Sequence, residues 1–285
     1  MTAQIVWLDG TGVGLPDVGE VGPRAAGLAR LRMHRVPVPR GFVLGRSLFT
    51  EFTTAARRDP SHVLPKLSPS TLRDLADALR ALGGSAAIRR SPLGGTRQSG
   101  EWQVITGGRP ERETYLHLTD AAEVHEAVRR IWGGQSPMPV AIVVQRFILP
   151  EVCAVVRRDP ADCDLLHVES AFGIGDLLAA GLVVPDRHTI RGRDGSVLAS
   201  SLGRKAQMSI PRADGGVVRV PVPVKAARGI ALDAAKLDAL AGTWRAAQQA
   251  LGPLNQMGLA FCSGRWFVTS AMEAPDVAAE GALLG

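Results

Sequence analysis

Cysteines and histidines are the first side chains to consider for chemistry. The three cysteines, Cys153, Cys163 and Cys262, form no Cys-x-x-Cys pair and have no His-x-x-x-His segment beside them, which argues against a zinc site or a disulfide framework. The six histidines lie in unrelated contexts, and no Gly-x-Ser-x-Gly segment marks a nucleophile. The sequence therefore indicates neither a structural metal site nor a hydrolase of a familiar type.

Glycine-rich segments are the next candidates, because they can cradle phosphate. Residues 9–14 read Asp-Gly-Thr-Gly-Val-Gly and follow a short apolar run, but their spacing is not Gly-x-Gly-x-x-Gly. Leu15-Pro16 also follows where a dinucleotide-binding helix should begin. The chain has no Gly-x-x-x-x-Gly-Lys-Ser/Thr loop. Any nucleotide site must therefore be of another kind.

Arginine dominates the charge of this 285-residue chain. It carries 33 Lys+Arg against 27 Asp+Glu, a net charge of +6, and only four of the cations are lysines. The arginines are scattered and aromatic residues make up 5%, whereas nucleic-acid platforms pair cations with stacking aromatics. We therefore expect no nucleic-acid partner. An anionic small molecule, or arginine-rich codon usage alone, accounts for the charge.

Amphipathic helices and short apolar strands must position any site. Leucines at helical spacing predict a helix over residues 70–82, ended by Gly83-Gly84. Helices are also expected over residues 121–132 and 232–251. Strands are expected over residues 4–8, 86–89 and 140–145. We expect the last of these to continue as an edge or hairpin through residues 152–156. A closing hairpin of residues 257–262 and 266–270 is also expected. This mixture predicts an α/β (α+β) protein.

Seven short phrases occur in a fixed order along the chain. They are Val21-Gly-Pro-Arg24, Val36-Pro-Val-Pro-Arg-Gly-Phe42, Ala87-Ile-Arg89-Arg-Ser91-Pro92, Ser99-Gly100-Glu101, Val143-Val-Gln145-Arg-Phe147-Ile148, Glu169-Ser-Ala-Phe-Gly173-Ile-Gly175-Asp176 with Pro185-Asp186, and Leu202-Gly203-Arg-Lys205. In this order they resemble the nucleotide-binding domain of the phosphoenolpyruvate synthase and pyruvate phosphate dikinase family. The resemblance extends over about residues 5–272.

The resemblance implies an ATP-grasp-like, two-lobed nucleotide-binding fold. Residues 1–135 would form an N-terminal lobe carrying Arg24 and Arg89, and residues 136–285 a C-terminal lobe ending in a β-hairpin. ATP would lie between the lobes. Arg24 and Arg89 stand where the family has a lysine and an arginine, and guanidinium groups grip phosphate oxygens bidentately. The implied nucleotide-binding residues are Arg24, Arg89, Gly100, Gln145, Phe147, Ile148 and Thr269.

Roles without any ligand contact remain open for the same residues. Arg24 and Arg89 could be surface cations, and Phe147 and Ile148 could be ordinary core. The catalytic residues are unknown from the sequence.

The closing hairpin departs from the family pattern. The family's hairpin reads Asp-Ile-Glu-Trp and then Gln-Ala-Arg-Pro, which supplies magnesium ligands and an arginine. Met257 and Ala271 stand at two of those positions, and a thioether does not bind magnesium. With a register one residue different, Asn255 or Gln256 could reach a metal. We therefore expect ATP as the cofactor and doubt Mg²⁺.

Two functions are compatible with these residues. In one, the chain is an ATP-binding phosphotransferase-like (kinase-like) protein that lacks the family's histidine and phosphoenolpyruvate domains and works with a separate phosphohistidine-domain protein. In the other, it is a catalytically degenerate homologue, a pseudoenzyme whose cleft binds another ligand or serves as a docking or regulatory subunit. No secretory signal or apolar run of eighteen residues is visible, so a cytoplasmic protein without membrane contact is expected.

Overall fold

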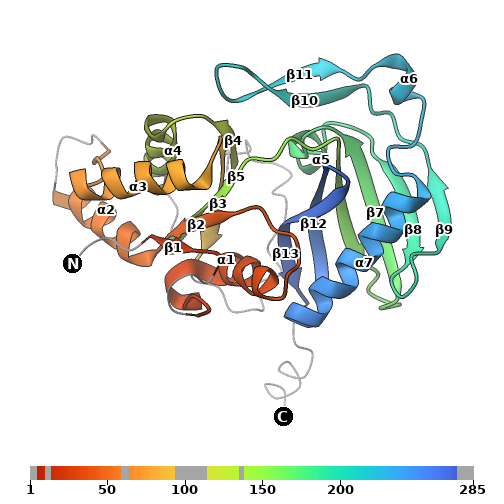
Figure 1. The fold of residues 1–285 in the computed structure, drawn as a ribbon, viewed down its shortest axis with the longest axis horizontal. Helices are drawn as coiled ribbons and strands as arrows, with labels where there is room; N and C mark the ends of the chain where they lie inside the picture. Colours follow the sequence, from red (N-terminus) through yellow and green to blue (C-terminus); the bar gives the residue numbers. More distant parts are fainter. Residues whose placement is uncertain (1–4, 10–13, 59–63, 94–113, 135–137, 275–285) are drawn as a thin grey trace, which may run out of the picture.

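Two antiparallel β-sheets, each covered by helices, make up the fold (Figure 1). The structure is a computed structural model, and it describes residues 5–9, 14–58, 64–93, 114–134 and 138–274. The first sheet has the strand order β1-β2-β5-β3-β4, and the second has the order β13-β12-β6-β7-β8-β9. The α/β (α+β), two-lobed architecture predicted from the sequence is confirmed.

The first sheet separates two layers of helices. Its apolar residues alternate, so that Val43 and Val143 join α1 on one face while Phe42 and Val144 join α2, α3 and α4 on the other. The elements of this lobe are β1 (Val6–Trp7), α1 (Val18–Met33), β2 (Gly41–Leu44), α2 (Arg46–Arg58), α3 (Pro69–Leu82), β3 (Ala86–Pro92), β4 (Thr114–Leu118), α4 (Ala121–Gly133) and β5 (Val140–Arg146). The predicted helices over residues 70–82 and 121–132 are confirmed as α3 and α4.

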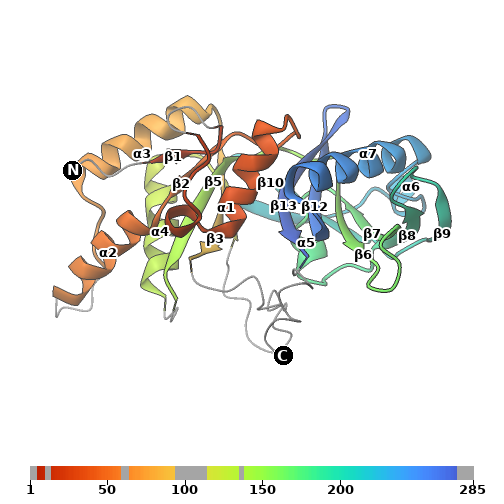
Figure 2. The same cartoon turned by 90° about the horizontal axis from the view of Figure 1, so that it is seen from below.

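The long helix α7 covers one face of the second sheet, and on the other face Leu178 of the short α5 packs on Cys153 and Ala171. Trp244 of α7 packs on Val156, Met257 and Leu259, and Figure 2 shows α7 lying along that face. Its elements are β6 (Val152–Arg158), β7 (Leu165–Phe172), α5 (Asp176–Ala179), β8 (Asp186–Arg191), β9 (Val197–Ser201), α6 (Val224–Ala227), α7 (Ala234–Leu251), β12 (Leu254–Cys262) and β13 (Arg265–Glu273). The face opposite α7 is called the open face below.

The chain crosses between the sheets at residues 147–151. β5 pairs with β2 and β3 in the first sheet, whereas β6 pairs with β7 and β12 in the second. The expectation that the strand over residues 140–145 continues as an edge or hairpin through residues 152–156 is therefore wrong. By hydrogen bonding, β5 belongs with the first lobe, although the predicted division falls at residue 135.

A separate hairpin reaches from the second lobe back to the first. It consists of β10 (Gln207–Pro211) and β11 (Val217–Pro221), which pair only with each other as strands. At its tip the Gly216 amide donates to the His117 carbonyl of β4 at 2.9 Å, and Figure 1 shows the hairpin spanning toward that strand. No helix in the described ranges is both long and apolar enough to cross a membrane.

Candidate functional site

A break in helix α1 forms the first wall of the candidate site. Gly22 has φ 79° and ψ 160°, a backbone conformation that essentially only glycine adopts. A Cβ at this position would lie 2.5 Å from Ser91 Oγ and 2.8 Å from the Pro92 carbonyl oxygen. The helix resumes at Pro23, and the Ala25 amide donates to Ser91 Oγ at 3.3 Å. The Val-Gly-Pro-Arg phrase thus lets the helix lie directly on β3.

This close approach brings Arg24 to the strand that carries Arg89. Arg24 Nη1 donates to the Arg90 carbonyl at 2.9 Å. Arg89 Nη1 donates to Gln145 Oε1 of β5 at 3.1 Å. Across the sheet, Arg89 pairs with Val143, and Ala87 pairs with Gln145. Because side chains alternate between the two faces of a strand, the side chains of Arg89 and Gln145 point to the same face, the one that α1 covers. Arg24, Arg89 and Gln145, far apart in sequence, therefore lie in one cluster.

The electrostatics of this cluster favour an anion. Burial, and to a smaller extent the nearby positive charge of Arg24, lower the pKa of Arg89 to about 10. Arg89 remains charged at neutral pH, and no carboxylate among the described residues pairs with it. Gln145 is 1% exposed, and its Nε2 has no hydrogen-bond partner within the described residues. Two cations and a buried amide donor thus lie together in this cluster.

The crossing segment lies beside this cluster in the chain. The Phe147 amide donates to the Ser85 carbonyl at 2.7 Å, and the Phe147 ring meets the His117 ring edge-on, with centroids 5.1 Å apart. Phe147 and Ile148 are half-buried. Neither belongs to an apolar core cluster of the described residues, so their role as ordinary core is not supported. Gly100 lies outside the described residues.

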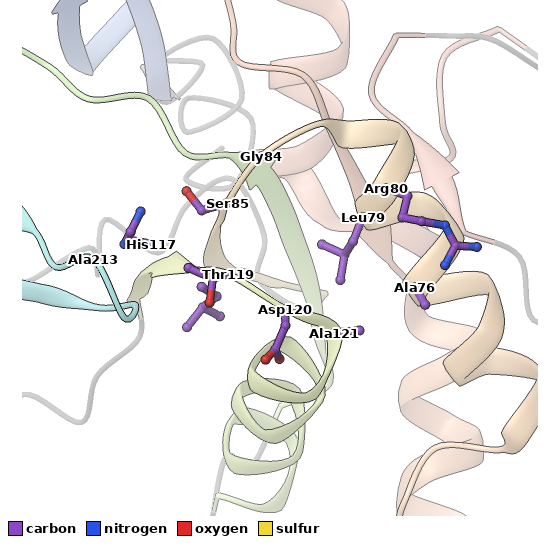
Figure 3. A pocket seen from close by; sticks show the side chains of 11 residues that line it. Ala76, Leu79, Arg80, Gly84, Ser85, His117, Thr119, Asp120, Ala121 and Ala213 are labelled. Carbon is purple, nitrogen blue, oxygen red and sulfur yellow. The ribbon is translucent and has the colours of Figure 1, made fainter.

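A cavity of about 540 Å³ opens next to the crossing segment, and the sequence did not predict it (Figure 3). It lies between the end of α3, the start of α4 and the hairpin tip, with Ser85, His117 and Ala213 among its lining residues. His117 has φ 57°, and its buried Nδ1 has no partner within the described part of the chain. No sequence motif marks this cavity, because three distant segments form it.

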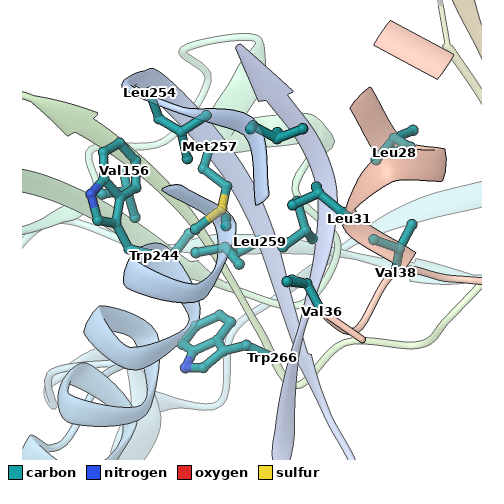
Figure 4. Packing of buried hydrophobic residues seen from close by; sticks show 14 of the residues in the cluster. Leu28, Leu31, Val36, Val38, Val156, Trp244, Leu254, Met257, Leu259 and Trp266 are labelled. Carbon is teal, nitrogen blue, oxygen red and sulfur yellow. The ribbon is translucent and has the colours of Figure 1, made fainter. Parts of the chain in front are cut away.

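The closing hairpin places Met257 in the core. Met257 is fully buried against Trp244, Leu254 and Leu259 (Figure 4). Because side chains alternate along a strand, Gln256 and Gly258 point to the open face instead. On β13, Gly258 faces Ser270 and Gln256 faces Met272. Met257 and Ala271 therefore face the α7 core, whereas Gln256, Gly258 and Ser270 face the open face.

Thr269 lies at an irregularity in this hairpin. Gly258 pairs with Ser270 and Leu259 with Val268, so Thr269 is the extra residue. Its Oγ1 would be 3.3 Å from a Cβ on Gly258. Thr269 thus lies beside Gly258, which faces the open face.

Magnesium does not fit the described residues of this hairpin. Mg²⁺ prefers carboxylate oxygens in octahedral geometry, and the outward positions are Gln256, Gly258 and Ser270. The oxygen Gln256 Oε1 already accepts from Arg157 Nε at 3.1 Å. No group of three or more His, Cys, Asp or Glu within the described ranges could hold a metal ion. Whether the chain uses Mg²⁺ stays a prediction.

Two of the sequence phrases form a buried ion pair. Asp186 and Lys205 are ion-paired with fully buried side chains. Asp186 Oδ1 also accepts from the Gly203 amide at 2.8 Å, and Oδ2 accepts from the Ala231 amide at 2.7 Å. Pro-Asp and Leu-Gly-x-Lys thus have a structural role: they attach the segment that leads into β10 to the second sheet.

A family model now connects this geometry to known proteins. The model described as "Pyruvate phosphate dikinase, AMP/ATP-binding domain" matches residues 111–262, which is more than half of the chain. The chain belongs to this family. The resemblance stated from the sequence is confirmed, and the two-lobed α/β structure is the ATP-grasp-like fold that it implied.

Curated relatives are longer than this chain. A probable phosphoenolpyruvate synthase of Methanothermobacter thermautotrophicus is 25% identical over 289 residues, covering 84% of this chain and 42% of the relative. A rifampicin phosphotransferase of Streptomyces sp. is 25% identical over 248 residues, covering 72% of this chain and 28% of the relative. The chain thus spans less than half the length of either relative.

Solved structures are more distant. A dinucleotide-forming acetyl-coenzyme A synthetase 1 of Ca. Korarchaeum cryptofilum is 13% identical, with a TM-score of 0.38, and 87% of this chain and 90% of that chain are covered. Because this similarity is low, the fold assignment comes from the family model and the sheet topology instead.

Proposed function

We propose that this chain binds ATP between its two lobes, with the phosphates at Arg24 and Arg89. The observation that carries the proposal is the convergence of these two arginines, from α1 and β3, on one buried face with Gln145. Bringing two like charges together without a described counter-charge on Arg89 is costly. A polyphosphate removes that cost by accepting hydrogen bonds from both guanidinium groups.

The other predicted contacts are assigned around that phosphate position. Phe147 and Ile148, on the segment that crosses between the sheets, contact the adenine by apolar surface and backbone. Gln145 donates its free Nε2 hydrogen to the ligand. Gly100 and Thr269 complete the phosphate contacts. The half-buried state of Phe147 and Ile148 supports this assignment, because a ligand would cover the surface left exposed.

In the main proposal the chain is the ATP-binding component of a phosphotransferase-like protein. The family model names an AMP/ATP-binding domain. Transfer to a further substrate would then need a phosphohistidine domain outside these 285 residues, on another polypeptide or on another part of a longer protein. The coverage of less than half of each relative supports this division of labour.

One observation favours the second candidate, a catalytically degenerate homologue. The outward-facing residues Gln256, Gly258 and Ser270 of the β12–β13 hairpin carry an amide, a hydrogen and a hydroxyl, none of which is a carboxylate. A metal stabilises the charge of a transferring phosphoryl group by several kcal/mol, and a charge-stabilising arginine contributes about 10³ to 10⁵ in rate. A chain without either would bind a nucleotide, or another ligand, without turning it over.

A calorimetric titration of the wild-type chain tests the proposal. ATP in EDTA is expected to bind, and AMP and adenosine to bind progressively more weakly, because fewer phosphate oxygens meet the arginines. The absence of heat with millimolar ATP would contradict nucleotide binding. Following ATP consumption in the same sample separates the two candidates, since only the first predicts turnover when a phosphohistidine-domain protein is added.

A further inference from the structure

Four polar side chains are joined on the open face of the second sheet. Arg157 of β6, Glu169 of β7 and Arg187 of β8 lie on neighbouring strands, with Glu169 directly opposite Arg187. Arg157 Nη1 lies 2.8 Å from Glu169 Oε2, and Arg187 Nε lies 3.1 Å from Glu169 Oε1. Arg157 Nε also donates to Gln256 Oε1. The carboxylate thus holds one arginine with each oxygen, and Gln256 holds the first arginine from the other side.

This cluster carries net positive charge. Two guanidinium groups share one carboxylate, and burial, which raises the pKa of Glu169, is outweighed by the hydrogen bonds from Arg157 and Arg187, which lower it. The side chains of Arg157 and Arg187 remain 47% and 61% exposed. A guanidinium has five N–H donors, so both arginines keep donors that face solvent. An anion can therefore reach them without breaking the contacts that fix them.

The position of Arg157 is what distinguishes it from an ordinary surface cation. Its guanidinium is bonded to Gln256, which the sequence names with Asn255 as a residue that could reach a metal and which lies on the open face together with Gly258 and Ser270. A divalent cation next to Gln256 would meet an amide oxygen, Oε1, that already accepts a hydrogen bond from Arg157. It would also lie beside the positive charge of that arginine. Coulomb repulsion disfavours the metal there, while a phosphate oxygen is attracted.

We propose that Arg157, fixed by Gln256 and Glu169, supplies the positive charge beside the terminal phosphates that a divalent cation would otherwise supply. The site then takes a nucleoside polyphosphate free of metal and discriminates it from a monophosphate. This inference rests on the proposed nucleotide function, and it assigns to Arg157 a role that nothing in the family pattern predicts. Arg187 acts as a positioning residue, because it shares the carboxylate that orients Arg157.

The test compares ATP binding by three proteins, with EDTA and with magnesium chloride. They are the wild type, Arg157→Gln and the matched control Arg212→Gln. Arg212 is also an exposed arginine paired with a carboxylate, Asp214, but it lies at the tip of the β10–β11 hairpin. We expect wild-type affinity in EDTA to be at least equal to that with magnesium. Arg157→Gln should weaken ATP binding tenfold or more and leave adenosine binding unchanged, and Arg212→Gln should match the wild type.

Each other outcome has a distinct meaning. Wild-type binding that strengthens tenfold with magnesium, or equal ATP affinities of Arg157→Gln and wild type, would overturn the inference and leave the proposed nucleotide function standing. No ATP binding by the wild type would remove both. Urea unfolding of each variant guards against misfolding. If Arg157→Gln proves unfolded, Arg157→Lys replaces it, since lysine keeps the charge but loses the two-sided contact, and a weaker preference for ATP over AMP is then expected.

Discussion

Gly22 lies so close to Ser91 that a single added carbon would be 2.5 Å from the serine Oγ. Its backbone also has φ 79°. Gly22→Ala should therefore lower the free energy of unfolding by about 2 kcal/mol or more and weaken ATP binding through Arg24. Gly27→Ala, in the same helix with nothing within 4 Å of a built Cβ, should instead raise stability by about 0.5–1 kcal/mol. Urea titrations measure both. Equal effects of the two changes would contradict the described packing.

Removing one partner of the buried Asp186–Lys205 pair leaves an uncompensated charge. Lys205→Met should lower the free energy of unfolding by about 3–5 kcal/mol. Lys236→Met, which breaks the Lys236–Asp233 pair, in which the Asp233 side chain is 59% exposed, should cost less than about 1 kcal/mol. Chemical denaturation compares the two variants. A Lys205→Met protein as stable as the Lys236→Met protein would show that the pair does not anchor the segment.

His188 should make stability depend on pH. Burial lowers its pKa, and the charge of Lys205 lowers it further, although Asp186 acts in the opposite direction. The unfolded chain, with a histidine pKa of about 6.5, then binds more protons than the folded chain, so stability falls as pH drops below that value. Urea midpoints at about pH 7.5 and 5.5 should differ more for the wild type than for His188→Gln. An equal change of the urea midpoint between the two pH values in both proteins would contradict the buried neutral state of His188.

Met257→Glu should fail as a way to restore a metal site. Its side chain is enclosed by the α7 core, so the substitution buries an unpaired carboxylate and should cost more than about 3 kcal/mol. Gln256→Glu, on the open face beside Arg157, should change stability by less than about 1 kcal/mol. Magnesium binding that appears in folded Met257→Glu would show that this residue faces the ligand after all.

Strong periodicity made part of the fold predictable. The leucine spacing of α3 and the long α7 segment with its closing hairpin were read correctly, because a helix face and a hairpin are local patterns. The partners of β5 were not, because its uninterrupted apolar run over residues 140–144 carries no sign of which sheet contains it. The β10–β11 hairpin was missed for a related reason: its contacts with Asp176 and His117 are long-range.

The sequence predicted a residue of the candidate site only where that residue lies in one of the seven phrases that resemble the family. Arg24 and Arg89 were identified from their phrases and lie together in the structure, and their role as ligands stays a prediction. Which hairpin residues face the open face could not be predicted, because the irregularities at Asn255 and Thr269 shift the alternation of β12 and β13. Arg157 was not singled out at all, since its meaning depends on Gln256, 99 residues away.

Titration of ATP into wild type, Arg24→Ala, Arg89→Ala and the double variant tests the central claim most directly. Each single change should weaken binding by about 1.5–3 kcal/mol, the scale of a charged hydrogen bond. The double change should be non-additive, because the two guanidinium groups share one ligand. Wild-type affinity in both single variants would contradict the account, and would mean that these arginines do not bind phosphate.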